Sequence, residues 1–417
     1  MGSRRPDEQE LIYDWNLVGD VPEPHKVVLN DESLRDGLQS PSITDPSIED
    51  KIEILHLMEK LGIGMANLGL PGAGPRAVED VTRLAEVIRD DKLALRPNCA
   101  ARTVAVDIEP IAAIQDKTGV PITAATFLGS SAVRQYTENW DIDRLLKHTE
   151  EAVKLCVKLG LENMFVTEDT TRARPETIDR IYRTAIECGA RRIVVCDTVG
   201  HATPHGVRML IKHIRELIKS TGEEVTVDWH GHNDRGLGLI NAIAAVEAGV
   251  DVVHGAALGI GERCGNTAMD QMIVNLRLMG YFPEDIDLTL LPRYVQKVSE
   301  VCEVPIPRNY PVIGPDAFET ATGVHAAAVI KALKKGDAML ADLVYSGVPA
   351  GVFGLEQSIT IGPMSGRSNV IFWLEKRKIE ATDALVDAIF EKAKSSQTIL
   401  TDEEIMSEVG KTAGAAG

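Results

Sequence analysis

Between residues 26 and 282 the chain repeats one pattern: a short run of apolar and β-branched residues, a turn, and an amphipathic stretch. Strand–helix–strand units of this kind form right-handed crossovers and a parallel sheet. The expected strands are residues 26–33, 64–70, 93–100, 121–129, 163–169, 192–200, 225–232 and 250–259. Eight such strands predict an α/β fold, a closed (β/α)₈ TIM barrel rather than an open doubly wound sheet. None is followed by the glycine motif of a dinucleotide-binding or P-loop fold.

The pattern changes after residue 282, where proline and glycine become frequent between helical stretches. A proline-marked linker covers residues 305–315, and a Gly/Pro-rich passage covers 345–369. Helices are expected near residues 322–336, 383–395 and 402–410. We therefore expect four regions: an N-terminal arm (1–25), a catalytic TIM barrel (26–282), a linker with mostly helical C-terminal accessory subdomains (283–410) and a disordered tail (411–417).

Charge and apolar content exclude several classes of protein. The chain has 44 basic and 62 acidic residues, a formal charge of −18, and no basic stretch, which argues against nucleic acid or an anionic membrane as partner. No window of 18 consecutive apolar residues is present, and the charged start lacks the apolar core of a signal peptide. The six cysteines form no CxxC pair and are interpreted as reduced thiols. A cytoplasmic protein is expected.

Chemically active side chains follow the predicted strands, at the end where barrels of this kind build their active sites. His230 and His232 alternate on strand 7, so both project to the same side. With a carboxylate after strand 1, such as Asp36, they predict a site for Mg²⁺, Mn²⁺ or Zn²⁺. The alternative is a hydrogen-bonded histidine pair in a polar loop. Asn266, after strand 8, is either a neutral oxygen ligand or a helix N-cap.

Arg35 directly precedes Asp36 and is well placed to stabilise an enolate or carboxylate oxygen in a dry pocket, unless the segment is an ordinary solvent-facing charge cluster. Glu32 is a further carboxylate of the same segment. Other histidines, among them His254, have no partner pattern and are interpreted as structural.

Five segments at the predicted strand ends resemble the alkylmalate synthases, which include 2-isopropylmalate, homocitrate and citramalate synthases. These belong to the metal-dependent barrel superfamily that also contains hydroxymethylglutaryl-CoA lyase. The segments are SLRDGLQSP (33–41), TEDTTR (167–172), DTVGHATP (197–204), HGHNDRGLG (230–238) and GIGERCGN (259–266). Beyond the barrel, GVHAAAV (323–329) and IGPMSGRSNV (361–370) resemble the accessory subdomains of the synthase branch. That branch is favoured because the lyases lack such a region.

The resemblance implies a role for each matching residue. The metal ligands would be Asp36, His230, His232 and Asn266. Arg35 would hold the 2-oxo acid, together with Thr198, Asn67 and Ser130. The catalytic residues would be Arg35, Glu168, His325 and Tyr345. His325 matches a histidine that reaches the active site of a neighbouring subunit, which implies a homodimer. The alternative for His325 is a position on a helix surface. For Glu168 the alternative is an ion pair with Arg172.

The implied enzyme is an acyltransferase that converts the acyl group into an alkyl group on transfer. It would catalyse a metal-dependent Claisen condensation of acetyl-CoA, as co-substrate, with a 2-oxo acid, giving a 2-alkylmalate-type hydroxy diacid and CoA. A 2-isopropylmalate synthase without the feedback domain is the leading expectation, for a role in amino-acid biosynthesis. Homocitrate synthase, citramalate synthase, a carbon–carbon lyase or aldolase, and a silent metal-binding paralogue are the alternatives.

Two positions depart from the family pattern. Asn67 stands where the family usually has a glutamate at the end of strand 2, so the hydrogen bonds around Arg35 must differ. Ala125 stands where isopropylmalate synthases tend to have histidine. The expected pocket residues are mostly small or neutral, which favours an acceptor with a branched apolar chain such as 2-oxoisovalerate; they are Asn67, Leu70, Asn98, Ala125 and Phe127. Arg134 either meets a second carboxylate of the acceptor or is a solvated surface residue, which we prefer.

Overall fold

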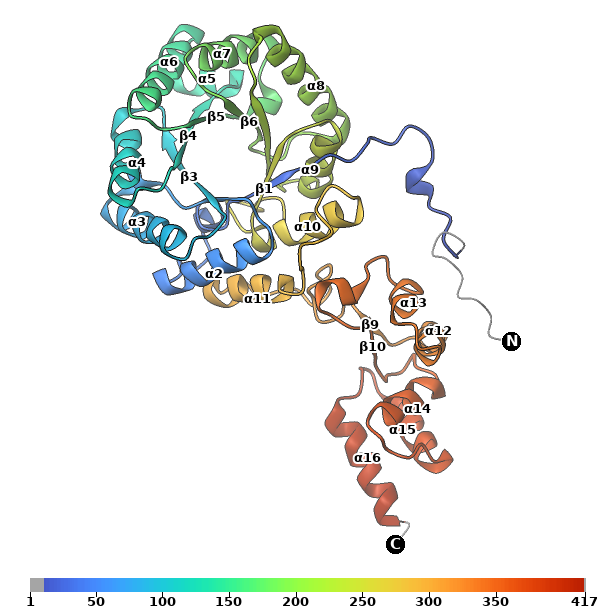
Figure 1. The fold of residues 1–417 in the computed structure, drawn as a ribbon. Helices are drawn as coiled ribbons and strands as arrows, with labels where there is room; N and C mark the ends of the chain where they lie inside the picture. Colours follow the sequence, from blue (N-terminus) through green and yellow to red (C-terminus); the bar gives the residue numbers. More distant parts are fainter. Residues whose placement is uncertain (1–10, 416–417) are drawn as a thin grey trace. The chain divides into compact units, whose positions relative to one another are not determined.

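The computed structural model describes residues 11–415. Within this range eight parallel strands close into a barrel in sequence order, with β1 hydrogen-bonded to both β2 and β8 (Figure 1). The strands are β1 (Val28–Asp31), β2 (Met65–Asn67), β3 (Arg96–Arg102), β4 (Thr123–Gly129), β5 (Asn163–Glu168), β6 (Arg192–Asp197), β7 (Thr226–Gly231) and β8 (Val252–Gly255). Each lies inside or within two residues of an expected strand. The predicted TIM barrel is confirmed.

Helices surround the strands of the barrel (Figure 1). They are α3 (Pro75–Asp90), α4 (Ala105–Thr118), α5 (Ala132–Glu138), α6 (Ile142–Lys158), α7 (Pro175–Glu187), α8 (Pro204–Thr221), α9 (Gly238–Glu247) and α10 (Met269–Leu278). Proline occupies the first position of α7 and α8, where its missing N–H is not needed. The Thr203 side chain accepts a hydrogen bond from the Gly206 amide and caps α8. All six residues of β6 are buried, as expected for a strand covered on both faces.

The chain forms two compact units, one with residues up to Pro41 and Ile63–Glu284, the other with Ser42–Gly62 and the residues from Asp285 onward. The second unit therefore begins close to the predicted boundary at residue 282, but it also takes in α2 (Ile48–Lys60). In that unit α2 contacts α11 (Leu291–Cys302). Lys297 of α11 forms ion pairs with Asp50 and Glu53 of α2, which explains this grouping.

The rest of the second unit is mostly helical, as predicted. It contains α12 (Gly323–Lys334), α13 (Ala338–Leu343), α14 (Arg367–Lys376), α15 (Asp383–Ser395) and α16 (Asp402–Ala415), with a two-stranded parallel sheet of β9 (Glu319–Thr320) and β10 (Ser358–Ile359). Helices α11, α13 and α14 were not predicted. Trp373 and Val370 of α14 are buried against residues of α15 and α16. This packing stabilises α14 although its own sequence has no clear helical pattern.

Helix α16 continues past residue 410 to Ala415, into the segment where we expected a disordered tail. The tail prediction for 416–417, and the part of the N-terminal arm formed by residues 1–10, lie outside the described residues. Within residues 11–415 no helix combines the length and apolar character needed to cross a membrane.

Candidate active site

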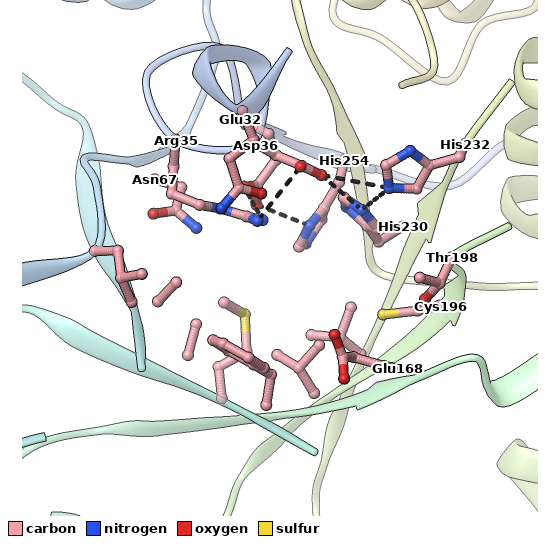
Figure 2. A pocket seen from close by; sticks show the side chains of 18 of the residues that line it. Glu32, Arg35, Asp36, Asn67, Glu168, Cys196, Thr198, His230, His232 and His254 are labelled. Carbon is pink, nitrogen blue, oxygen red and sulfur yellow. Dashed lines mark hydrogen bonds and ion pairs between the residues drawn. The ribbon is translucent and has the colours of Figure 1, made fainter. Parts of the chain in front are cut away.

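A cavity of about 290 Å³ lies inside the barrel, and all of its lining residues belong to the first unit (Figure 2). Its lining has two chemically different halves. Polar side chains come from β7, β8, β2 and the segment after β1: Glu32, Arg35, Asp36, Asn67, His230, His232 and His254. Apolar side chains come mainly from β3 to β6: Leu70, Ala100, Ala125, Phe127, Met164, Val166 and Val194. A small ligand in this cavity would contact charged groups on one side and mainly hydrocarbon on the other, where Glu168 at the end of β5 is a charged exception.

Asp36, His230 of β7 and His232 directly after β7 meet in the polar half. Asp36 Oδ2 lies 3.2 Å from His230 Nε2 and 3.5 Å from His232 Nε2, and the two Nε2 atoms are 3.3 Å apart. Burial lowers the pKa of His230, which favours a neutral ring with a free lone pair. Burial alone would raise the pKa of Asp36, but Arg35 and the two histidines hold it well below its usual range. An anionic oxygen and two imidazole nitrogens therefore converge, as metal binding requires.

Two buried polar atoms close to this cluster lack a partner within the described chain, and of these the acceptor oxygen of Asn266 is the one that could serve a cation. His232 Nδ1 is buried without a hydrogen-bond partner within residues 11–415, and so is Asn266 Oδ1. Asn266 pairs with His232 in an isolated β-bridge, and its Nδ2 donates to the Ile260 carbonyl. Since α10 begins at Met269 with Ala268 as its N-cap, the N-cap alternative for Asn266 is wrong. The donor set fits a divalent cation held by Asp36, His230 and His232, with an amide oxygen nearby.

A second set of possible ligands is Glu32, His230 and His254. His254 Nδ1 lies 3.2 Å from Glu32 Oε1, and its Nε2 lies 2.8 Å from Asp228 Oδ2. Carboxylate oxygens only accept, so both ring nitrogens donate and the ring is an imidazolium. Burial opposes this charge, but the hydrogen bonds to Asp228 and Glu32 raise the pKa of His254. An imidazolium has no lone pair for a metal, so we favour the first set.

Arg35 is held by a carboxylate from its own segment. Its Nε and Nη2 donate to Glu32 Oε2 at 3.0 and 2.5 Å, and its Nη1 lies 3.6 Å from Asp36 Oδ1. Burial would raise the pKa of Glu32, but Arg35 and His254 lower it to about 2. Asn67 lines the cavity and its Oδ1 accepts from the Gly69 amide. The sequence predicts that the hydrogen bonds around Arg35 differ from the family pattern because Asn67 replaces a glutamate. In the structure Glu32 provides the carboxylate that holds Arg35.

Glu168, at the end of β5, lies across the cavity from Asp36 (Figure 2). Burial raises the pKa of Glu168, and the half-exposed Arg134, 3.8 Å from its Oε2, opposes this. Arg172 pairs with Asp169 at 2.7 Å, so an ion pair between Glu168 and Arg172, the alternative considered above, is wrong. Arg134 also lies 3.5 Å from Glu138, which agrees with the surface role preferred for it.

The two hydroxyls predicted to bind substrate are placed differently. Thr198 lines the cavity, and its Oγ1 accepts from the Asp169 amide at 2.9 Å. Ser130 is fully buried and is not among the cavity-lining residues identified within the described chain. Its hydroxyl donates to the Glu168 carbonyl at 2.8 Å. The position of Ser130 therefore does not agree with the predicted substrate contact, because its hydroxyl is used to hold the end of β5.

His325 and Tyr345 belong to the second unit, so the first unit alone does not bring them to the cavity. Both side chains are exposed, and their rings stack with centroids 4.2 Å apart. His325 thus lies on the surface of α12, in contact with one aromatic neighbour.

From the sequence His254 is interpreted as structural, and no role is predicted for Asp228. One signal was available for Asp228, because it alternates with His230 and His232 on β7 and so faces the same side. Asn30 of β1 is the register partner of His254 on β8, which shows how barrel closure brings the segment after β1 beside this histidine.

Fold and cavity together define a (β/α)₈-barrel protein of the kind that collects reactive side chains at the carboxyl ends of its strands. Residues 26–298 match the HMGL-like family, so the chain belongs to that family.

Two sequence relatives can be aligned with most of this chain. The homocitrate synthase of Methanopyrus kandleri is 31% identical over 386 residues, which cover 92% of this chain and 91% of the relative. The 2-isopropylmalate synthase of Pyrococcus furiosus is 30% identical over 375 residues, covering 88% of this chain and 72% of the relative. The crystal structure of the HMG-CoA lyase of Bacillus subtilis has a TM-score of 0.57 and 21% identity, covering 69% of this chain and 97% of that one, and it shows the shared fold.

Proposed function

We propose that this chain is an acyltransferase that condenses acetyl-CoA with a 2-oxo acid, releasing CoA and a 2-alkylmalate-type hydroxy diacid. The observation that carries the proposal is the two-sided cavity, in which Arg35 and the cluster of Asp36, His230 and His232 face a hydrocarbon wall. Relatives named homocitrate synthase and 2-isopropylmalate synthase, at about 30% identity, support the reaction class.

Three parts of the cavity have distinct tasks in this reaction: the metal cluster, Arg35 and Glu168. A divalent cation on Asp36, His230 and His232 would supply Lewis-acid polarisation of the keto oxygen. Arg35 supplies a fixed positive charge for the acid's oxygen atoms within the cavity. Glu168 accepts or holds a proton on the opposite side, and burial makes its carboxylate a stronger base than an exposed one. Water then hydrolyses the thioester of the condensed product.

The apolar half indicates an acceptor with an aliphatic side chain. The apolar lining combines the small Ala100 and Ala125 with the larger Phe127 and Met164, and the lining from β3 to β6 offers no cation for a second carboxylate in that half. Burying a carboxylate there without a partner would be costly. We therefore propose a branched acid such as 2-oxoisovalerate rather than 2-oxoglutarate.

Thiol release from acetyl-CoA tests the proposal directly. We expect metal-loaded protein to turn over 2-oxoisovalerate with a kcat/KM at least about tenfold higher than for pyruvate, because two buried methyl groups add apolar contact. Oxaloacetate, glyoxylate and 2-oxoglutarate complete the panel. A preference for 2-oxoglutarate would overturn the proposed acceptor, and absence of turnover with every acid would overturn the reaction.

The exposed pair of His325 and Tyr345 leads us to propose a homodimer in which they complete the partner's site. Glu168→Gln and His325→Ala should each lower kcat on the order of 10²-fold or more. If each site uses Glu168 of one subunit and His325 of the other, mixing the two inactive variants should restore about a quarter of wild-type activity, since half of the dimers are mixed and each has one intact site.

The two variants are unfolded and refolded together, and separately refolded samples mixed afterwards are the control. No recovery, with mixed dimers demonstrated by differential tagging, would contradict a shared site. Full activity of a diluted monomer would do so as well.

A further inference from the structure

We infer that Glu32 and His254 are positioning residues that fix the Arg35 guanidinium for the 2-oxo acid, an inference that rests on the proposed function. Neither is needed as a metal ligand, and both line the polar half of the cavity (Figure 2). Their effect on substrate is exerted through Arg35.

The side chains form one buried row of alternating charge. Arg192 at the start of β6 donates to Asp228, Asp228 accepts from His254, and His254 donates to Glu32. Glu32 then accepts from Arg35. The first four side chains are at most 5% exposed, so each has little solvent to replace a missing partner. Each carboxylate therefore depends on the cation at either side.

The two oxygens of Glu32 have different partners. Oε1 accepts from His254 Nδ1 and, at 2.8 Å, from Asn30 Nδ2, and Asn30 is itself held by Asn98 at 2.7 Å. Oε2 receives both Nε and Nη2 of Arg35. A carboxylate fixed on its first oxygen can accept the guanidinium in only one orientation. Arg35 therefore keeps the same orientation before substrate arrives, and it need not reorganise in the reaction.

His254 acts on Glu32 and not on the substrate, because both of its ring nitrogens are already used. In a His254→Gln variant the glutamine is uncharged and carries both of its side-chain donors on one nitrogen, so it cannot place a donor at the positions of both ring nitrogens. The Glu32 carboxylate then rotates, and Arg35 follows it. The metal cluster does not include these atoms, so its occupancy should not change.

Binding and kinetics of His254→Gln test the inference. For metal-loaded protein we expect the calorimetric Kd and the KM for the 2-oxo acid to rise about 10- to 100-fold, the range for loss of a supporting hydrogen bond. The KM for acetyl-CoA and the bound-metal content should equal those of wild type. Glu32→Gln should give the same change, and the double variant no more than either single one, since both act through one contact.

His213→Gln is the matched control, because His213 also pairs with a carboxylate, Asp179 at 2.8 Å, but in a half-exposed position outside this cavity. Glu32→Asp keeps the charge and only shortens the reach to Arg35, so it tests the geometry if His254→Gln folds poorly. Unchanged acid binding in Glu32→Asp and Glu32→Gln, or a loss of metal that accounts for the effect, would overturn the inference. A wild-type protein that neither binds nor converts any 2-oxo acid would instead overturn the proposed function.

Discussion

Replacing His232 with alanine should remove the divalent cation and reduce turnover on the order of 10³-fold or more. His232 offers one of three ligand atoms that lie within 4.8 Å of one another, and the two that remain cannot hold a cation firmly. The polarisation that the cation supplies amounts to several kcal/mol, and each 1.36 kcal/mol is about tenfold in rate. Metal content after dialysis and the rate of thiol release are the two measurements.

His205→Ala is the control for this prediction, because His205 is exposed at the start of α8 and does not line the cavity. It should bind metal and turn over substrate like the wild type. A His232→Ala protein that retains one equivalent of metal would show that the ligand set is wrong, and the Glu32, His230 and His254 set would then be the next to examine.

Replacing Arg192 with methionine should lower the free energy of unfolding of the barrel by about 3–5 kcal/mol, the effect of leaving a buried charge without its partner. Asp228 is fully buried and Arg192 is 5% exposed at its side chain. Burial would raise the pKa of Asp228, but Arg192 and His254 together lower it, so the carboxylate is ionised at neutral pH. Without Arg192 that charge depends on His254 alone. Urea unfolding, followed by tryptophan fluorescence, measures the change.

Arg191→Met provides a neighbouring control. Arg191 pairs with Glu223 at 2.9 Å, but both side chains are nearly half exposed. Water screens such a pair, and its loss should change the free energy of unfolding by at most about 1 kcal/mol. Equal effects of the two substitutions would mean that the Arg192–Asp228 pair contributes no more than an exposed one.

Much of this protein follows from local patterns in its sequence. The eight strands are predictable because apolar runs separated by amphipathic stretches have a regular spacing, and a count of eight favours the closed barrel that the structure shows over an open sheet. His230 and His232 could be paired because a strand has a period of two residues. Asp36 could be added because the carboxyl ends of all strands meet at one end of the barrel.

Helix α14 and the buried row of charged side chains could be recognised only from the tertiary structure. Helix α14 exists because Val370 and Trp373 are buried against α15 and α16, and such burial has no signature within ten residues of sequence. The row from Arg192 through Asp228 and His254 to Glu32 joins residues from β6, β7, β8 and the segment after β1. The sequence around His254 in β8 does not indicate that Glu32 and Asp228 are its partners. Its charge arises only when barrel closure places a buried carboxylate at each ring nitrogen, because burial is what makes each charge depend on the next.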